Sequence, residues 1–290
     1  MVKHTLRTFV PGLGLLLLAC SAGDPPGFDT PESVLHDAAA DVYLVSNIQG
    51  APLDKDGNGY ITRLQPDGGM QRYWIRGGRD GVTLNAPKGL ALFGAVLWVA
   101  DIDVLRKFDR LTGKPLGEVA IPGATFLNDV SIAPDGTVYC TDTGLDAKFG
   151  PTGTDAIWRV PPGGEPVALA RGAELGQPNG LVALATGVYV VSWRDGTFYQ
   201  VDNQGRRTDL GKAPQAQLDG LVRVEPRADA SAVWLASSWA GKCVYRFSLQ
   251  GACTALPSEL EQPADCGYDT KRGRLLVPLF GQNRIELLQQ

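Results

Sequence analysis

The sequence predicts an all-β protein, a six-bladed β-propeller preceded by an N-terminal lipoprotein signal peptide. Two observations predict the propeller. A phrase of short hinge, alternating apolar strand, polar or Gly turn and second apolar strand recurs six times. The 36 Gly and 20 Pro are scattered along the chain as turn residues between short elements. The signal peptide is predicted by a basic start, a short apolar run and a Cys.

Residues 1–19 are the predicted signal peptide. Lys3 and Arg7 precede an apolar run, residues 9–19, that is too short to span a bilayer comfortably. The sequence LLAC that ends at Cys20 resembles a bacterial lipobox, in which cleavage before the Cys leaves a thiol that is acylated. A plain cleaved signal is the alternative.

Lipidation at Cys20 would tether the protein to a membrane of the bacterial cell envelope. Ser21 after the Cys, in place of an Asp, favours the outer membrane, facing the periplasm. Residues 20–30 would then be a lipidated tether, and residues 31–290 the propeller. The sixth repeat ends after its third strand, so residues 22–29 are the candidate closing strand, although two Pro make them a poor one.

The six predicted blades follow one another at propeller spacing. Their second strands are VYLV, LWVA, VYCT, VYVV, VWLA and LLVP, and their third strands are YITRL, VLRKF, IWRV, FYQV, VYRF and RIELL. The steps between equivalent positions are 56, 40, 51, 40 and 45 residues. Steps of about 40 to 50 residues with several strands each are typical of propeller blades.

One position of the repeat faces the channel in every predicted blade, because each innermost strand starts at the same end of it. We call these residues the ring: Glu32, Lys88, Asn128, Asn179, Asp219 and Ala264. Two carboxylates and two carboxamides would converge there. Such hard oxygen ligands suit Ca²⁺, or Mg²⁺ or Mn²⁺ with waters. The alternative is an axial polar network stabilised by Lys88, whose ammonium would repel a cation unless it reaches away or pairs with Glu32.

The ring and the phrases around it resemble the family of regucalcin and the gluconolactonases, with paraoxonases and diisopropyl fluorophosphatase as more distant relatives. The phrases are PESVLHD, FLNDVSIAPDGTVYCTD, QPNGLVAL and QLDGLVRV, and the resemblance covers residues 30 to 290. In that family a Glu, two Asn and an Asp surround a divalent cation that polarises the substrate's carbonyl or phosphoryl oxygen. The resemblance implies that Glu32, Asn128, Asn179 and Asp219 are the metal ligands here, with Asn128 also touching substrate.

Two departures from the family concern the substrate. Lactonases that act on sugar acids carry an Arg two residues before the Asn, where this chain has Phe126. Sugar-lactone recognition is therefore not expected. Paraoxonase-like histidines are also missing, because the chain has only His4, in the signal, and His36. We interpret His36 as a core or lower-channel residue.

Metal-assisted hydrolysis of a lactone or related ester is the simplest function that these residues support. Asp219 would act as base or nucleophile, together with Asn128, while Asn128, Lys88 and Phe126 would contact substrate. The cofactor would be a divalent metal ion, with Ca²⁺ favoured. A non-catalytic envelope module that binds a small molecule or a protein partner is the alternative, and a purely structural propeller is a third.

Two long loops are expected to wall the channel mouth: residues 46–59 and 141–155. Trp193 and Trp239 end strands on the same rim, as apolar walls or as packing between blades. The same rim carries three acids, as solvated loop residues or supporting partners of the site: Asp101, Asp103 and Asp142.

The first of these loops contains LDKDGNGYIT, which starts like a calcium-binding EF-hand loop. It lacks flanking helices, and its twelfth position is Gln65 where a bidentate Glu is needed, so it is not an EF-hand. Four groups could still hold a second, weak calcium ion, with a simple Asp- and Gly-rich turn as the alternative: Asp54, Asp56, Asn58 and the Tyr60 carbonyl.

Composition excludes other classes. The net charge is -4 and no stretch gathers Lys and Arg, so we expect no nucleic-acid partner. We expect a monomer. Four cysteines besides the lipobox residue lack CxxC spacing, which argues against zinc and leaves free thiols or a disulfide open: Cys140, Cys243, Cys253 and Cys266.

Overall fold

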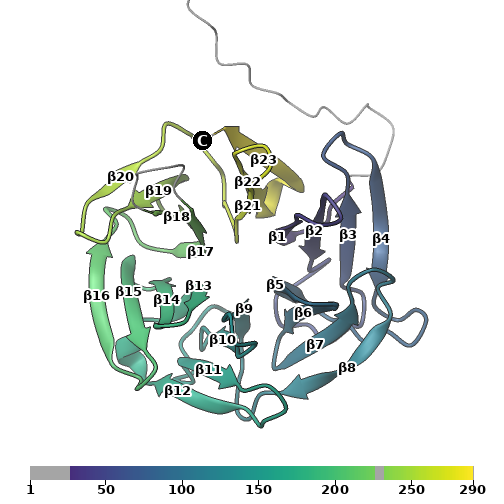
Figure 1. The fold of residues 1–290 in the computed structure, drawn as a ribbon, viewed down its shortest axis with the longest axis horizontal. Helices are drawn as coiled ribbons and strands as arrows, with labels where there is room; N and C mark the ends of the chain where they lie inside the picture. Colours follow the sequence, from purple (N-terminus) through teal and green to yellow (C-terminus); the bar gives the residue numbers. More distant parts are fainter. Residues whose placement is uncertain (1–26, 226–231, 290) are drawn as a thin grey trace, which may run out of the picture.

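A computed structural model describes residues 27–225 and 232–289, and it is a six-bladed propeller around a central channel (Figure 1). Blades one to three are formed by β1 (Pro31–Asp37), β2 (Val42–Asn47), β3 (Tyr60–Leu64), β4 (Met70–Arg76), β5 (Pro87–Phe93), β6 (Val96–Asp101), β7 (Val104–Asp109), β8 (Pro115–Ala120), β9 (Leu127–Ile132), β10 (Val138–Asp142), β11 (Ala156–Val160) and β12 (Val167–Arg171). Blades four to six are formed by β13 (Pro178–Leu184), β14 (Gly187–Ser192), β15 (Thr197–Asp202), β16 (Arg207–Lys212), β17 (Leu218–Val224), β18 (Val233–Ser238), β19 (Cys243–Phe247), β20 (Cys253–Ala255), β21 (Gly267–Asp269), β22 (Arg274–Leu279) and β23 (Arg284–Gln289).

The all-β, six-bladed prediction is confirmed, and each predicted second and third strand is a strand of the structure. The only helices among the described residues are two 3-10 turns, Ala173–Leu175 and Phe280–Gln282. None of the described helices is long and apolar enough to cross a membrane. The outermost strands, such as β8 with the sequence PLGEVA, are largely exposed, so they lack the alternating pattern that located the inner strands.

The hydrophobic core lies between the faces of neighbouring blades. Leu44 and Ile61 of blade one, for example, pack with Leu90, Leu97 and Val99 of blade two. Similar clusters join the following pairs of blades. Because apolar residues fill these contacts all round, the innermost strands are held rigidly and their first residues have fixed positions.

A β-bulge marks the start of the innermost strand in the first five blades. In β1 the register passes from Pro31 opposite Asn47 to Val34 opposite Val45, so two residues of β1 face one residue of β2. The same irregularity occurs in blades two to five. The bulged pair always contains the ring residue and the one after it. A bulge re-aims side chains, which turns the ring residues into the channel.

Blade six has three strands in the described part of the chain, so its outer edge is not completed there by a fourth. Of the predicted closing strand, residues 22–26 lie outside the described residues, as do the signal peptide and Cys20. Residues 27–29 are described and form no strand, although the buried ring of Phe28 packs beside Ile285 and Leu287 of β23.

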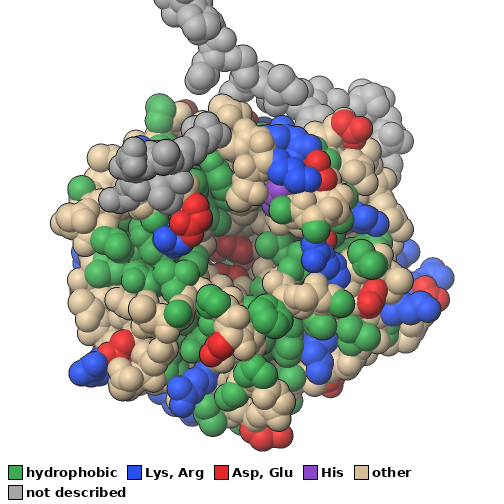
Figure 2. All heavy atoms as spheres, viewed as in Figure 1, with side chains coloured by type: hydrophobic (Ala, Val, Ile, Leu, Met, Phe, Trp, Pro, Cys, Tyr) green, Lys and Arg blue, Asp and Glu red, His purple; other side chains and the backbone are tan. Residues whose placement is uncertain are grey.

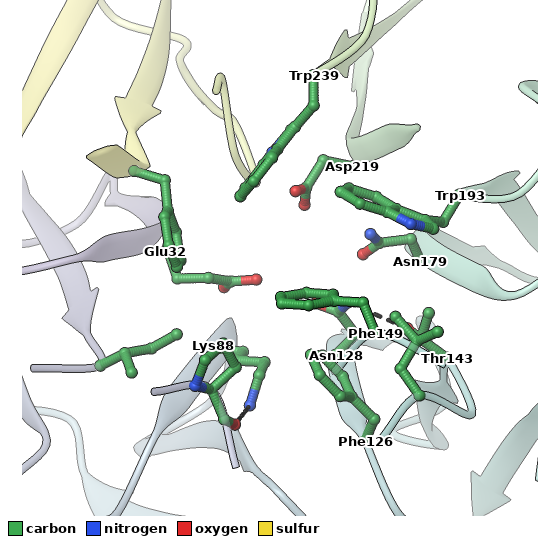
Figure 3. A pocket seen from close by; sticks show the side chains of 14 residues that line it. Glu32, Lys88, Phe126, Asn128, Thr143, Phe149, Asn179, Trp193, Asp219 and Trp239 are labelled. Atoms are coloured by element: carbon green, nitrogen blue, oxygen red, sulfur yellow. Dashed lines mark hydrogen bonds between the residues drawn. The ribbon is translucent and has the colours of Figure 1, made fainter. Parts of the chain in front are cut away.

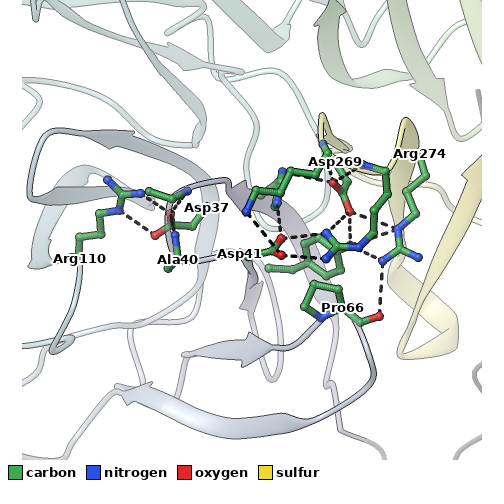
Figure 4. A network of polar contacts seen from close by, with 12 residues as sticks. Asp37, Ala40, Asp41, Pro66, Arg110, Asp269 and Arg274 are labelled. Atoms are coloured by element: carbon green, nitrogen blue, oxygen red, sulfur yellow. Dashed lines mark hydrogen bonds and ion pairs between the residues drawn. The ribbon is translucent and has the colours of Figure 1, made fainter.

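A network of charged side chains closes the circle between blades one and six (Figure 4). Asp41 accepts hydrogen bonds from Nη1 and Nη2 of Arg272, both at 2.8 Å. Asp269 accepts one from the Tyr43 hydroxyl at 2.5 Å and pairs with Arg274 Nε at 3.3 Å. We call these five side chains the clasp. It joins the turn between β1 and β2 to the turn between β21 and β22.

Candidate metal and substrate site

The ring side chains converge on one pocket at the end of the channel where the innermost strands begin (Figure 3). The pocket is lined by Glu32, Ile48, Pro52, Lys88, Phe126, Asn128, Thr143, Leu145, Phe149, Asn179, Trp193, Asp219, Trp239 and Phe280. Five of the six ring residues are among them. The sixth, Ala264, is buried in blade six and its methyl group leaves that side of the ring without a polar group.

Three oxygens of the ring are buried without a hydrogen-bond partner: Glu32 Oε2, Asn179 Oδ1 and Asp219 Oδ1. Their residues are 5%, 2% and 4% exposed. A buried oxygen that is left unpaired costs about 1–3 kcal/mol, and more when it is charged. Three such oxygens on one pocket, from blades one, four and five, fit the oxygen-only coordination that Ca²⁺ prefers.

Burial and mutual repulsion raise the pKa values of the ring acids. Burial raises the pKa of Glu32 well above its usual range, and the negative charges of Asp219 and Asp265 raise it further. Burial also raises the pKa of Asp219 well above its usual range, and the negative charge of Asp265 raises it further. The nearby Trp239 indole lowers this pKa, but by less. The charge of Lys88 lowers the pKa of Glu32 but does not offset these effects. A divalent cation in the pocket would supply the missing positive charge.

Lys88 is almost fully buried, and its ammonium reaches away from the carboxylates. Nζ donates to the Pro52 carbonyl oxygen at 2.8 Å and to the Ala86 carbonyl oxygen at 3.1 Å. It also lies 4.8 Å from the centre of the Phe126 ring. Burial lowers the pKa of Lys88 to about 8, although the charge of Glu32 acts in the opposite direction. Loop residues 46–59 thus hold this cation at one side of the pocket.

Asn128 is oriented by its amide nitrogen. Nδ2 donates to the Thr143 hydroxyl at 3.0 Å, and that hydroxyl donates to the Pro178 carbonyl oxygen at 2.9 Å. Since the nitrogen is engaged with Thr143, the amide orientation is fixed. This contact ties blade three to the start of blade four.

Buried aspartates hold the backbone just before three ring residues. Asp101 accepts from the Ala86 nitrogen at 2.9 Å, Asp142 from the Phe126 nitrogen at 2.9 Å, and Asp155 from the Gln177 nitrogen at 2.7 Å. Each of these nitrogens belongs to the residue two places before the ring position. Asp101 and Asp142 are thus supporting residues, whereas Asp103 is exposed and pairs with Lys55. Asp155 is not among the residues that the sequence predicted. Its position immediately before the third strand of blade three could have indicated it.

Four of the six ring residues follow a residue with a left-handed backbone, again two places earlier. These residues are Thr30, Gln177, Gln217 and Gln262, with φ between 49° and 59°. Such values are unusual for side chains of this size and favour tight changes of chain direction. Local strain in the backbone therefore helps to aim the ring, and the recurrence of Gln at three of these four positions is the sequence signal that accompanies it.

A second tier of polar groups lies beneath the ring. Asp129 accepts from the Leu181 nitrogen at 2.7 Å, and Asp265 accepts from the Ser33 hydroxyl at 2.5 Å. In blade four, the residue after the ring position is Gly180. A Cβ atom there would lie 2.4 Å from the Asp219 carbonyl oxygen, so this position has no room for a side chain. Unlike the ring oxygens, these carboxylates have hydrogen-bond donors.

The opposite face of the propeller has a central hollow of about 350 Å³, with acidic side chains in its depth (Figure 2). Asp129, Asp265 and His36 are among its lining residues. His36 lies 3.3 Å from Asp41 and 3.7 Å from Asp269. The lower-channel interpretation of His36 is confirmed, because it does not line the ring pocket.

The loop proposed to hold a second calcium ion has a compact turn. Asp54 and Asp56 are exposed, and Asn58 Nδ2 donates to Asp56 at 2.6 Å. The Asn58 side-chain oxygen is buried without a partner. Tyr60 is the first residue of β3. Binding of calcium by this loop stays a prediction.

The described cysteines are all free thiols, so no disulfide forms among them: Cys140, Cys243, Cys253 and Cys266. Three of them are buried. Among the described residues there is also no cluster of three or more His, Cys, Asp or Glu placed to hold a metal ion. The proposed ring ligands differ from such a cluster, because two of the four are the side-chain amides of Asn128 and Asn179.

The fold and the pocket define a six-bladed propeller with an oxygen-lined channel mouth. Neither a protein family nor a curated protein matches the sequence. Among solved structures, a gluconolactonase of Xanthomonas campestris is 18% identical with a TM-score of 0.59, covering 89% of this chain and 94% of that chain. A structural-genomics target assigned as a gluconolactonase is 18% identical with a TM-score of 0.64, covering 91% and 90%.

A virginiamycin B lyase has the same fold. A catalytically inactive variant of the Staphylococcus aureus enzyme, in which Ala replaces a histidine, was solved with quinupristin. It is 14% identical with a TM-score of 0.58, covering 90% of this chain and 94% of that chain. At these identities the likeness shows a common fold. The resemblance to gluconolactonase-type propellers is thereby confirmed at the level of architecture.

Proposed function

We propose that this protein is a divalent-metal-dependent hydrolase of a lactone or related ester. The observation that carries the proposal is the set of three buried, unpartnered oxygens of Glu32, Asn179 and Asp219 around one pocket. These residues would hold the ion, with Asn128 beside them toward the substrate. Oxygen ligands alone, without His or Cys, favour Ca²⁺.

A bound cation would act in this pocket as a Lewis acid on the substrate's carbonyl oxygen. Asp219 would accept a proton from the attacking water at its second carboxylate oxygen, Oδ2, while Oδ1 holds the ion. Asn128 would position the substrate through its fixed amide, and the buried Lys88 ammonium would favour the negative charge that develops during ester cleavage. Apolar side chains above the ring would limit the access of bulk water.

Hydrolysis is favoured over elimination by the lack of a histidine among the described residues of the pocket. The lyase relative is described as inactive when one of its histidines is replaced by Ala. This chain has two histidines, and the described one, His36, lines the opposite hollow. The candidate proton acceptor near the ring is therefore a carboxylate.

Metal analysis and calorimetry test the proposal directly. Protein purified without chelator should contain a divalent ion, and titration of the stripped protein should give a site that Asp219→Asn weakens by at least ~10-fold. Asp37→Asn is the control, because Asp37 is a buried acid that pairs with Arg110 far from the ring. A ring without a divalent ion, or one unaffected by Asp219→Asn, contradicts the proposal.

A non-catalytic binding module is the second candidate, and the buried Lys88 in the ring favours it, since a cationic neighbour opposes metal binding. A panel of lactones, esters and phosphotriesters separates the two candidates. No turnover of any member, with or without added divalent metal, would support the module.

We also propose that the chain is tethered to the outer membrane, facing the periplasm, through a lipid on Cys20. The support comes from the sequence alone, because Cys20 lies outside the described residues: LLAC indicates the lipid, and Ser21 after it favours the outer membrane. Labelling cells with an alkyne fatty acid should mark the wild-type chain and leave Cys20→Ala unlabelled. An unlabelled wild-type chain, or a labelled variant, would contradict the tether.

A further inference from the structure

The walls above the ring are apolar on every side that the described residues form. Ile48 and Pro52 come from blade one, and Leu145 and Phe149 from the long loop of blade three. Trp193, Trp239 and Phe280 continue the wall through blades four, five and six. We call this set, completed by Phe126, the apolar collar: Ile48, Pro52, Phe126, Leu145, Phe149, Trp193, Trp239 and Phe280.

The aromatic members of the collar contact one another. The rings of Trp193 and Trp239 meet edge to face with centroids 5.3 Å apart, and Trp239 and Phe280 lie 5.2 Å apart. Phe126 and Phe149 lie 6.4 Å apart. Aromatic pairs at these distances support each other's orientation. The collar thus contains one aromatic group that spans blades four to six and a second in blade three.

The polar groups of the pocket are confined to its floor, and several are already engaged. Thr143 bonds to Asn128 and to a carbonyl oxygen, and Lys88 donates to two carbonyl oxygens. In the collar, the buried side-chain donor is the Trp239 indole nitrogen, and it lies near Asp219, whose pKa it lowers. A sugar lactone carries several hydroxyls, which would lose their water here without replacement.

We propose that the site takes lactones or esters that carry an alkyl or aryl substituent, and discriminates against polyhydroxylated sugar lactones. This inference rests on the proposed function of the ring. The carbonyl of the substrate would lie on the polar floor, and its apolar substituent would lie against the collar. Phe126, two residues before Asn128, forms part of that surface.

Phe149 controls the room for such a substituent. The free volume of the pocket is only about 30 Å³, so a bound substituent must displace a side chain. Phe149 is the member that can move at least cost, because it is 48% exposed and lies on the loop of residues 141–155. Its backbone has a left-handed φ of 59°.

A graded lactone series tests the substrate class. The kcat/KM of calcium-loaded full-length protein is measured for δ-valerolactone, for its δ-ethyl, δ-butyl and δ-hexyl derivatives, and for glucono-δ-lactone. We expect kcat/KM to rise by roughly fourfold for each added methylene that is buried. Glucono-δ-lactone should be at least ~10²-fold poorer than the best alkyl lactone.

The outcomes separate the two proposals. Equal or better turnover of glucono-δ-lactone overturns the substrate class and leaves the hydrolase proposal standing. Calcium binding without turnover of any lactone overturns the hydrolase proposal. For that case, tryptophan fluorescence with the non-hydrolysable δ-hexyl valerolactam reports binding alone. Saturable binding tighter than that of unsubstituted valerolactam supports an apolar site, and equal affinities contradict it.

Two variants locate the effect. Phe149→Ala should enlarge the pocket and raise kcat/KM for the δ-hexyl lactone relative to the unsubstituted lactone, by a change in KM more than in kcat. Phe93→Ala is the matched control, because Phe93 is 45% exposed, ends β5 and is not among the residues of the pocket. Equal effects of the two variants on this ratio would overturn the role of the collar.

Discussion

The ring and the clasp are two groups of acids that are built in opposite ways. In the ring, Glu32 and Asp219 each keep an oxygen without a partner, and their pKa values are raised, first by burial and then by neighbouring negative charges. In the clasp, burial raises the pKa of Asp269, but hydrogen bonds from Tyr43 and Arg272 bring it below its usual range.

This difference indicates which acids stabilise the fold and which are placed to bind a ligand. A buried charge that is paired and hydrogen-bonded is part of the structure, whereas a buried charge without a partner is tolerated where something else binds. The clasp joins the first blade to the last. The ring side chains make no such link, although the Glu32 carbonyl oxygen accepts a hydrogen bond from the Asp265 nitrogen of blade six.

The largest expected effect separates the ring from the clasp by activity. Glu32→Gln should lower lactonase kcat/KM by about 10³-fold, since it removes a charged ligand of the proposed ion. In excess chelator the same variant should be at least as stable as the wild type, because a buried unpaired charge is gone. Urea unfolding with and without calcium measures the change in stability, and lactone turnover measures the change in activity. Destabilisation in chelator would show that the ring is structural.

The clasp should respond in the opposite sense. Asp269→Asn should lower the free energy of unfolding by about 3 kcal/mol, because it leaves buried partners of a charged network unpaired. Calcium affinity should be unchanged, since the clasp lies at the other face of the propeller. Denaturant unfolding and calcium titration of the same sample check this. If Asp269→Asn lowered calcium affinity as much as Asp219→Asn does, the clasp and the ring would not be functionally separate.

Acid should weaken the clasp specifically. Because the folded-state pKa of Asp269 is lowered, its contribution to stability is fully present above the unfolded-state value of about 4 and is lost as the pH falls through the folded-state value. The stability difference between wild type and Asp269→Asn should therefore shrink below about pH 4. Urea midpoints measured from about pH 7 to about pH 3 show this. A constant difference would exclude linkage to this carboxyl.

The smallest expected effect concerns the calcium proposed for the loop of residues 46–59. Asp56→Ala should reduce the bound calcium from two ions to one and change stability by less than about 1 kcal/mol, since Asp56 is exposed. Calorimetric stoichiometry measures the first change and thermal unfolding the second. One ion in both proteins would show that this loop is a simple turn.

The sequence determined the fold and the identity of the ring. Alternating apolar residues recur in six repeats because each blade must bury both faces of its inner strands, and that requirement is local enough to be read from the chain. The repeat also aligns Glu32, Asn128, Asn179 and Asp219, so their convergence could be predicted. The outermost strands could not be located, because exposed strands lack an apolar pattern.

Only the tertiary structure decided how those side chains are used. Bulges and left-handed residues aim the ring. Gln recurs at three of the four left-handed positions, but a Gln by itself does not predict a positive φ. The direction of Lys88 toward the Pro52 and Ala86 carbonyls, away from Glu32, depends on a loop of blade one. Phe280 and Phe149 join the apolar collar from segments far apart in the chain. Side chains from different blades come into contact only when the blades pack together, and the sequence of a single repeat does not determine these contacts.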